Sequence, residues 1–331
     1  MFFNCRVFYL FFVLILISNL TSAKSNDSPD LNKKVVQKIS WDEWKKKTKA
    51  EFKKNSNIEI QTLKYLDSIK FNPKIIELDR KQPEFKLTFD KYFKNIVTTE
   101  SKKKINSEFK KNKELLLKIE KQFNVNAKII TALWGIETYF GNHIGKMDIL
   151  RSLASLAYEG RRGVFFTKEL KNALIILDKG HFDRNMFRGS WAGAFGQTQF
   201  MPSTFLKHSI DFDGDNKKNL FKKNDALASG ANYLKKVGWN NQIEWGEKVN
   251  VVISEKLRIL AEKKQHQNIK FWNENGIILK KNYGNNLLRM IIPDSNNNQC
   301  YLVSKNFDVI LNWNRSNYFA LTVFLFSDEI K

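Results

Sequence analysis

Several residues on which common functional sites depend are scarce in this sequence. Its 331 residues include 2 cysteines and 4 histidines. Two cysteines exclude a disulfide-rich scaffold and a thiolate zinc cluster, and so few histidines argue against a histidine-rich metal site. With 5 prolines, the chain has no proline-rich linker between domains. The length suggests about two domains, and a hydrophobic content of 42% excludes wholesale disorder.

Acidic residues are also few, since Asp and Glu total 34 against 56 Lys and Arg, which gives a net charge of +22. Such an excess indicates an anionic partner, which is nucleic acid, a membrane surface or an acidic polymer. A lysine-rich surface that is only solvated is the alternative. The charge alone does not separate the two.

The N-terminus has the composition of a secretory signal peptide. Arg6 is the only charged residue within residues 1–23, Val7–Ile17 is an unbroken apolar run, and the segment ends in small residues at Ala23. An uncleaved membrane anchor is the alternative, but the uncharged stretch of 17 residues that ends at Ala23 is shorter than the roughly 20 that span a bilayer. We therefore predict a signal peptide over residues 1–23, cleaved after Ala23.

The two cysteines fit export without lipidation. Cys5 precedes the apolar run and is too early for a lipoprotein cysteine, so we expect no lipobox and a periplasmic protein. Cleavage leaves Cys300 alone, which excludes an intramolecular disulfide. Because an exported protein does not usually meet nucleic acid, we expect no nucleic-acid partner and favour an acidic polymer or the envelope surface.

Helical periodicity dominates the rest of the chain, with some β structure near its end. After a polar leader, the pattern predicts a helix that begins with a capping box at Ser40–Glu43, and then an irregular stretch with a short extended piece over 72–100. One long amphipathic helix is predicted over 105–123, followed by a helix over Ala127–Glu137 with Asn126 as its N-cap. Further helices are predicted within 150–180 and over Asp225–Val237, where the helix ends at Gly238. Val249–Ile253 and Leu287–Ile292 resemble strands, and Tyr318–Phe326 fits either a strand or a helix. The changes in pattern suggest an N-terminal helical segment over 24–100, a core over 101–245 and a C-terminal segment over 246–331.

One carboxylate stands on an apolar helix face. Ile130, Leu133, Trp134 and Glu137 recur at helical spacing. Burial of a carboxylate raises its pKa, and a carboxyl that stays protonated near neutral pH can donate a proton. The alternative is a glutamate at the helix end that turns to solvent, and periodicity alone favours that alternative.

The stretch Gly189–Ser203 combines small residues with aromatic and polar ones. Its glycines and alanines allow close approach of backbone, Trp191, Phe195 and Phe200 offer flat faces for sugar rings, and its serine and glutamines offer hydrogen bonds. A tightly packed junction between a helix and a loop explains the same composition, so both interpretations stay open here.

An acidic loop has the spacing of a calcium site at its front half. Asp211, Asp213 and Asp215 occupy positions 1, 3 and 5 of an EF-hand-like loop. The back half departs from the pattern, because position 12 is Lys222, which cannot bind a cation. An insertion would let Asp225 close the site, with the carbonyl of Lys217 as a further ligand. A solvated turn is the alternative.

Taken together, these segments resemble lytic murein transglycosylases of the B family. The resemblance runs in order from about Trp41 to the C-terminus, through Asp79–Phe85, Leu133–Gly141, Leu156–Arg162, Gly189–Ser203, Asp211–Asp215, Ala231–Leu234, Gly238-Trp239, Asn306-Phe307 and Asn312–Ala320. It implies a mainly helical, lysozyme-like catalytic core with flanking segments and some β structure. It also implies cleavage of the MurNAc–GlcNAc β-1,4 bond of peptidoglycan without water, which leaves a 1,6-anhydro end and serves cell-wall remodelling or recycling.

The resemblance also assigns roles to individual residues. Glu137 matches the single catalytic acid and base of the family, and the C-terminal segment would complete the substrate groove. The positions that match groove residues, or lie in matching segments, are Ser190, Gln199, Phe200, Met201, Tyr233, Arg161, Arg162, Asn314 and Tyr318. Asp211, Asp213, Asp215, Lys217 and Asp225 fall on a calcium loop over 211–225, so a structural Ca²⁺ ion is expected but no cofactor for catalysis. The chain departs from the family at Asn216, which replaces a glycine, and at Trp313, where tyrosine is common.

Two other functions stay open at this point. One is a hydrolytic muramidase on the same fold, and the other is a non-catalytic protein that binds peptidoglycan. Arg161 and Arg162 also have a structural alternative, since an ion pair explains their charge as well as contact with stem-peptide carboxylates does. Peptidoglycan strands are the expected partner, whereas other cell-wall enzymes as partners are not predictable from these residues.

Overall fold

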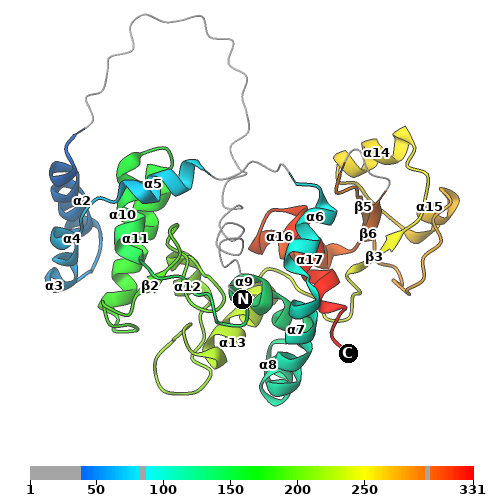
Figure 1. Cartoon of the computed structure of the whole chain (residues 1–331), viewed down its shortest axis with the longest axis horizontal. Coiled ribbons are helices and arrows are strands. Elements are labelled where there is room, and N and C mark those ends of the chain that lie inside the picture. Colours follow the sequence, from blue (N-terminus) through cyan, green and yellow to red (C-terminus); the bar gives the residue numbers. More distant parts are fainter. Residues whose placement is uncertain (1–38, 82–86, 295–298) are drawn as a thin grey trace, which may run out of the picture. The chain divides into compact units, whose positions relative to one another are not determined.

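A computed structural model describes residues 39–81, 87–294 and 299–331 (Figure 1). The segment predicted as signal peptide, residues 24–38 of the polar leader, and residues 82–85 of the first resemblance segment lie outside these ranges. None of the helices within them combines the length and apolar character that crossing a bilayer requires. The described residues form two units, each assembled from separated stretches of sequence: residues 39–81, 145–195 and 200–206, and residues 87–144, 196–199, 207–294 and 299–331.

The first unit is helical apart from one short pair of strands. Its elements are α2 (Trp41–Asn55), α3 (Ile60–Leu63), α4 (Tyr65–Ser68), α5 (Pro73–Arg80), β1 (Met147–Asp148), α10 (Ile149–Glu159), α11 (Gly163–Asp178), β2 (Arg188–Gly189) and most of α12 (Pro202–His208). Helix α10 packs on α11 and α5, and β1 pairs with β2 antiparallel. The predicted N-cap at Ser40 is confirmed, because the Ser40 hydroxyl accepts the Glu43 N–H at 3.2 Å.

The second unit joins a helical bundle to a small sheet. Its elements are α6 (Phe89–Ile96), α7 (Thr99–Lys111), α8 (Lys113–Phe123), α9 (Ala127–Thr138), α13 (Lys223–Lys236), β3 (Gly246–Val249), α14 (Glu255–Glu262), β4 (His266–Gln267), α15 (Ile269–Glu274), β5 (Leu288–Ile291), β6 (Cys300–Val303), α16 (Lys305–Trp313) and α17 (Asn317–Ser327). The sheet is antiparallel in the order β3-β6-β5-β4. Helix α9 packs against α7, α8, α13 and α17 (Figure 1).

Two predictions of secondary structure were wrong. Residues 72–100 contain α5 and α6 rather than an irregular stretch. Pro73 is the first residue of α5, where its missing N–H is not needed, and the Asn72 side chain caps the helix by accepting the Lys74 N–H at 3.2 Å. The helix predicted over 105–123 is broken at Asn112, whose side-chain amide donates to the Glu108 carbonyl at 2.8 Å and so competes with the helical backbone.

The C-terminal predictions were confirmed in part. Leu287–Ile292 contains β5, but only Val249 of the other predicted strand lies in β3. Tyr318–Phe326 lies within α17, whose residues are buried almost all round. Because the two units are interleaved in sequence, they do not test the boundaries near 100 and 245, which stay predictions.

Candidate active site

Glu137 lies near the end of α9, a helix with almost no exposed face. Asn126 caps α9 by accepting the Lys128 N–H at 2.8 Å, as predicted. From Ile129 to Thr138 every residue of α9 is buried, so a carboxylate anywhere in this stretch must be buried too. The side chain of Glu137 has 5% of its surface exposed, which rules out the glutamate that turns to solvent.

The chain reverses sharply directly after Glu137. Tyr139 and Phe140 both have positive φ, at 49° and 60°, a conformation that costs non-glycine residues free energy and often marks functional sites. Gln197 stabilises this turn from the loop opposite, because its side-chain oxygen accepts the Trp134 indole N–H at 2.8 Å and its carbonyl accepts the Thr138 hydroxyl at 2.8 Å. Gly141 lies in this turn, whereas α9 itself ends at Thr138.

Trp313 contacts the carboxyl group of Glu137 directly. Its indole Nε1–H donates to Oε1 of Glu137 at 2.8 Å. Burial raises the pKa of Glu137 to about 8, and the hydrogen bond from Trp313 opposes this rise because it stabilises the ionised form. A carboxyl with this pKa is mostly protonated at neutral pH, so it can donate a proton and later accept one. We did not identify Trp313 from the sequence as a partner of Glu137.

Helix α13 holds Trp313 in place. The Tyr233 ring meets the Trp313 ring edge-on, with centroids 5.2 Å apart and an interplanar angle of 81°. The Tyr233 hydroxyl donates to the carbonyl of Asn312, the residue before Trp313, at 2.7 Å. The indole also packs on α13 at Gly230, where a Cβ would lie 3.4 Å from Cη2 of Trp313, within ordinary van der Waals contact. The predicted site residue Tyr233 therefore reaches Glu137 through Trp313.

The other predicted binding residues of this unit have defined contacts. The Gln199 side-chain amide donates to the carbonyls of Ile144 at 3.1 Å and Gly196 at 2.9 Å, and the Asn314 side-chain oxygen accepts the Ser316 N–H at 3.1 Å. The Tyr318 hydroxyl donates to Asp294, and burial raises the pKa of Tyr318. Burial raises the pKa of Tyr92, a residue that the sequence argument missed, and the nearby charge of Glu137 adds to this rise.

Ser190, Phe200 and Met201 belong to the first unit. The Ser190 hydroxyl accepts the Ala194 N–H at 3.1 Å. Phe195 and Phe200 are 0% and 3% exposed, and they pair through their backbones. The rings proposed as flat faces for sugars are thus packed inside this unit, as the packed-junction alternative expects.

Arg161 and Arg162 form an ion pair with a buried carboxylate of their own unit. Both guanidinium groups reach Asp79, which is 3% exposed, and Arg162 does so at 2.6 Å. Arg162 also lies over the Phe166 ring, with its central carbon 4.7 Å from the centroid. This geometry favours the structural alternative for both arginines.

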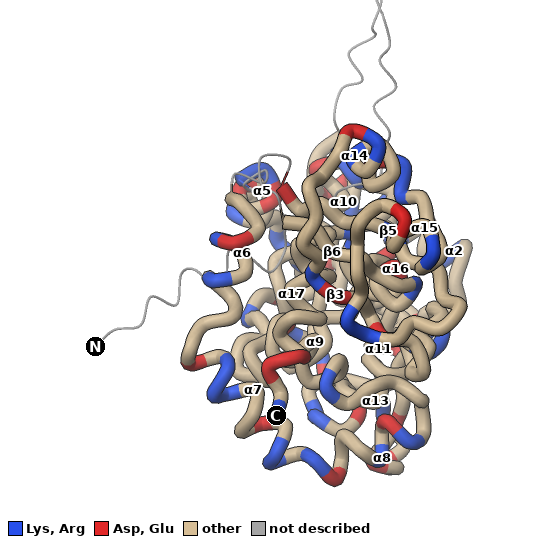
Figure 2. Tube along the Cα trace, turned by 90° about the vertical axis from the view of Figure 1, so that its right-hand side faces the viewer, with Lys and Arg blue, Asp and Glu red and all other residues tan. Residues whose placement is uncertain are grey.

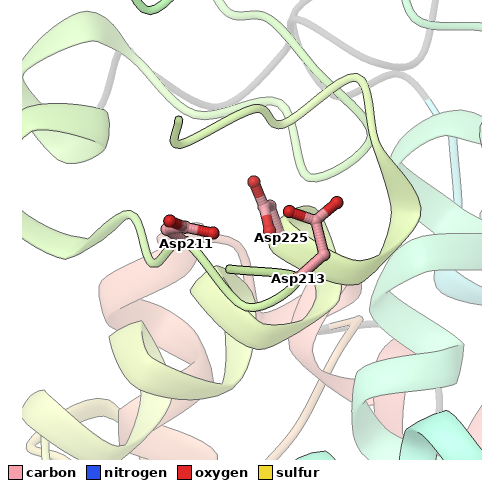
Figure 3. Close-up of side chains that lie close together, drawn as sticks. All are labelled: Asp211, Asp213 and Asp225. Carbon is pink, nitrogen blue, oxygen red and sulfur yellow. The ribbon is translucent and has the colours of Figure 1, made fainter. Parts of the chain in front are cut away.

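The acidic loop brings three carboxylates together. Oxygens of Asp211, Asp213 and Asp225 lie within 4.8 Å of one another (Figure 3), with Asp225 contributed by the start of α13. This donor set fits a hard cation such as Ca²⁺. The ammonium group of Lys222 lies 3.0 Å from Asp213 and also pairs with Asp215, and these bonds raise its pKa. A cation at this loop would therefore compete with Lys222.

Comparison with known proteins gives one family. Residues 40–328 match the family model described as Transglycosylase SLT domain. The curated membrane-bound lytic murein transglycosylase B of Escherichia coli K12 is 40% identical over 118 residues, which is 35% of this chain and 33% of that protein. The match therefore spans about a third of the length of this relative.

Solved structures match over more of the chain. SltB3 from Pseudomonas aeruginosa, in complex with NAG-NAM-pentapeptide, is 33% identical, with a TM-score of 0.83 over 87% of this chain and 79% of that one. The E. coli lytic transglycosylase Slt35, in complex with bulgecin A, is 25% identical, with a TM-score of 0.74 over 86% of this chain and 91% of that one. The predicted fold class, a mainly helical lysozyme-like core with some β structure, is confirmed.

Proposed function

The chain belongs to the Transglycosylase SLT domain family, and we propose that it is a lytic transglycosylase that cleaves the MurNAc–GlcNAc β-1,4 bond of peptidoglycan without water. One observation carries this proposal: a single glutamic acid, Glu137, buried at the end of an apolar helix, whose pKa burial raises to about 8. The bound peptidoglycan fragment of the relative SltB3 supports the substrate class.

The proposed reaction uses the carboxyl group of Glu137 twice. Protonated Glu137 first donates its proton to the glycosidic oxygen as the bond from that oxygen to C1 of the muramyl residue breaks. The carboxylate then removes the proton of the muramyl C6 hydroxyl, whose oxygen bonds to C1 and closes a 1,6-anhydro ring. The proton returns to Glu137, and no water is consumed. The nucleophile belongs to the substrate, so its effective concentration is high without help from the protein.

The second carboxylate of an ordinary glycosidase is not required in this scheme. The acetamido oxygen of the substrate stabilises the positive charge at C1, as in substrate-assisted exceptions to the paired-carboxylate rule. Two other acids of the first unit have structural partners, since Glu159 pairs with Arg80 and Glu169 accepts the Ser203 backbone N–H. The proposed substrate-binding residues are Ser190, Gln199, Met201, Tyr233, Asn314 and Tyr318, whereas the ring of Phe200 is packed inside the first unit and is not proposed to stack on a sugar.

The proposed partner is peptidoglycan, at the periplasmic envelope surface. Lys and Arg are spread along many elements rather than gathered in one patch (Figure 2), which suits non-specific attraction to a polymer with many carboxylates. We also propose a structural Ca²⁺ ion at this loop, held by Asp211, Asp213 and Asp225, whose carboxylate oxygens lie together, with Asp215 and the carbonyl of Lys217 as further ligands. The ion would stabilise the loop and take no part in the bond cleavage.

Mass analysis of the products tests the reaction. Purified sacculi digested by the full chain should yield muropeptides that end in 1,6-anhydro-MurNAc, and digestion in H₂¹⁸O should add no label to them. Products with a reducing end that carry the label would instead establish a hydrolytic muramidase. Binding to sacculi without any release of muropeptides would establish a non-catalytic binding protein.

A further inference from the structure

The hydrogen bond between Trp313 and Glu137 has a direction that cannot be reversed. An indole N–H is only a donor, so Oε1 of Glu137, 2.8 Å away, must accept in either protonation state of the carboxyl. The tyrosine common at this position in the resembling family could donate or accept. Trp313 therefore restricts this carboxyl in a way that tyrosine does not.

The indole is held rigidly enough for this restriction to persist. Trp313 is the last residue of α16 and is packed between the Tyr233 ring and the backbone of α13 at Gly230. The hydroxyl of Tyr233 fixes the preceding carbonyl at 2.7 Å. The turn of Tyr139 and Phe140 fixes the other partner, because it follows Glu137 at once.

We propose that Trp313 is a positioning residue that decides which oxygen of Glu137 carries the catalytic proton. Oε1 stays bound to the indole N–H throughout, and Oε2 donates the proton to the glycosidic oxygen and takes one back from the muramyl C6 hydroxyl. The carbonyl oxygen of a carboxylic acid is its better acceptor, so the neutral acid keeps its O–H on Oε2. This role rests on the proposed function.

The same bond favours the ionised form of Glu137. A donor to a carboxylate stabilises the negative charge, which burial alone would destabilise. The carboxylate of Glu137 that removes the proton from the muramyl C6 hydroxyl is therefore stabilised by the indole N–H. The net stabilisation from one hydrogen bond to a charged group corresponds to a shift of about one pKa unit or more. Loss of the indole N–H should thus raise the pKa of Glu137 by about one unit.

The chain contains a matched control for this test. Trp245 donates its indole N–H to a carboxylate of the same unit, Asp328, at 3.2 Å. The substitutions Trp313→Phe and Trp245→Phe each remove one indole donor to a carboxyl group of this unit, but only the first donor is bound to Glu137. Trp313→Tyr keeps a donor at position 313.

The primary experiment is a carboxyl ¹³C NMR titration of the full chain labelled at Cδ of glutamate, with the Glu137 signal assigned through Glu137→Gln. Trp313→Phe should raise the pKa of Glu137 by about one unit. In Trp313→Tyr, which keeps a donor, the pKa of Glu137 should stay close to its wild-type value. Trp245→Phe should leave the pKa of Glu137 unchanged. An unchanged pKa in Trp313→Phe, or an equal shift in Trp245→Phe, would overturn the proposal.

Two further readouts keep the test decisive. In the unsubstituted protein, the indole ¹⁵N–H signal of Trp313 should move with the Glu137 titration, which needs no variant to fold, and an immobile signal would contradict the proposal. With sacculi as substrate, Trp313→Phe should move the alkaline limb of the pH–rate profile upward by about one pH unit. If the protein releases no muropeptides, the proposed function fails, but both NMR measurements still decide the role of Trp313.

Discussion

Asp79 in the first unit and Glu137 in the second are both almost fully buried, yet their surroundings are opposite. Two arginines meet the carboxylate of Asp79, whereas Glu137 has the neutral indole N–H of Trp313 and an apolar helix around it. A buried charge needs compensation by an opposite charge or it becomes neutral. The charge of Asp79 is compensated by the two arginines, whereas Glu137 becomes neutral because burial raises its pKa.

The comparison distinguishes a buried carboxylate with a structural role from one that can transfer protons. The ion pairs of Asp79 with Arg161 and Arg162 connect α5 to the segment after α10. A carboxyl whose pKa lies near the working pH is an acid and a base in one group. Burial of an acid is therefore not by itself a sign of function, and the partners of the carboxyl decide which case applies.

The largest expected effect is on the reaction rate. Glu137→Gln should lower the release of muropeptides by about 10²–10⁴-fold, because the amide keeps the size of the side chain but cannot donate and retrieve a proton. Glu169→Gln is the matched control, because Glu169 is also buried, with 2% of its surface exposed, and burial raises its pKa as well. Comparable losses in both variants would remove the distinction drawn for Glu137.

The second prediction concerns stability and pH. The pKa of Glu137 is about 8 in the folded state and close to 4.5 when unfolded, so the folded state binds the extra proton and wild-type stability falls as pH rises through this window. Glu137→Gln lacks this dependence. Its free energy of unfolding relative to wild type should rise by on the order of 4 kcal/mol from pH 4.5 to pH 8, at about 1.4 kcal/mol per pKa unit. Urea denaturation at both pH values measures it, and parallel curves would contradict the assignment.

The third prediction concerns the opposite member of the comparison. Asp79→Asn should lower the free energy of unfolding by about 3 kcal/mol, because it leaves the largely buried Arg162 without its counter-charge. The double variant Asp79→Asn/Arg162→Gln should lose less than the sum of the single losses, as expected for residues in contact. Additive losses in denaturant titrations would show that the pair does not act as a unit.

The smallest effect is expected at the acidic loop, where Lys222 partly supplies the compensating charge. Calcium should raise the Tm by about 2–4 °C through binding to the folded state, and Asp211→Ala/Asp215→Ala should remove this gain. Lys222→Gln should enlarge it, because no ammonium group then competes with the ion. A Tm that responds to neither calcium nor chelator would refute the proposed metal site.

The position of Glu137 was predictable because the cap at Asn126 and the apolar periodicity are local features. Its burial was not, since periodicity could not show that α7, α8, α13 and α17 surround α9. Asp79–Phe85 and Leu156–Arg162 were both recognised as resemblance segments. The ion pairs of Asp79 with Arg161 and Arg162 were not predictable, because they join residues far apart in the sequence. Pro73 was misread for a local reason: proline ends helices from within but also begins them at the first position.

Trp313 shows most clearly what sequence reasoning could not reach. It was noted only as a departure from tyrosine, with the loss of a hydroxyl as its consequence. It lies 176 residues from Glu137, and no spacing rule connects the two. The hydrogen bond depends on how α16 ends and on the packing of the indole against α13, both of which require the fold.

The most direct test of the central claim is the ionisation of Glu137 in the unsubstituted protein. The carboxyl ¹³C signal of Glu137 should titrate well above its ordinary value of 4.5, with a midpoint near pH 8. A midpoint near 4.5 would mean that the carboxyl is ionised at neutral pH and cannot act as the proton donor, which would contradict the account.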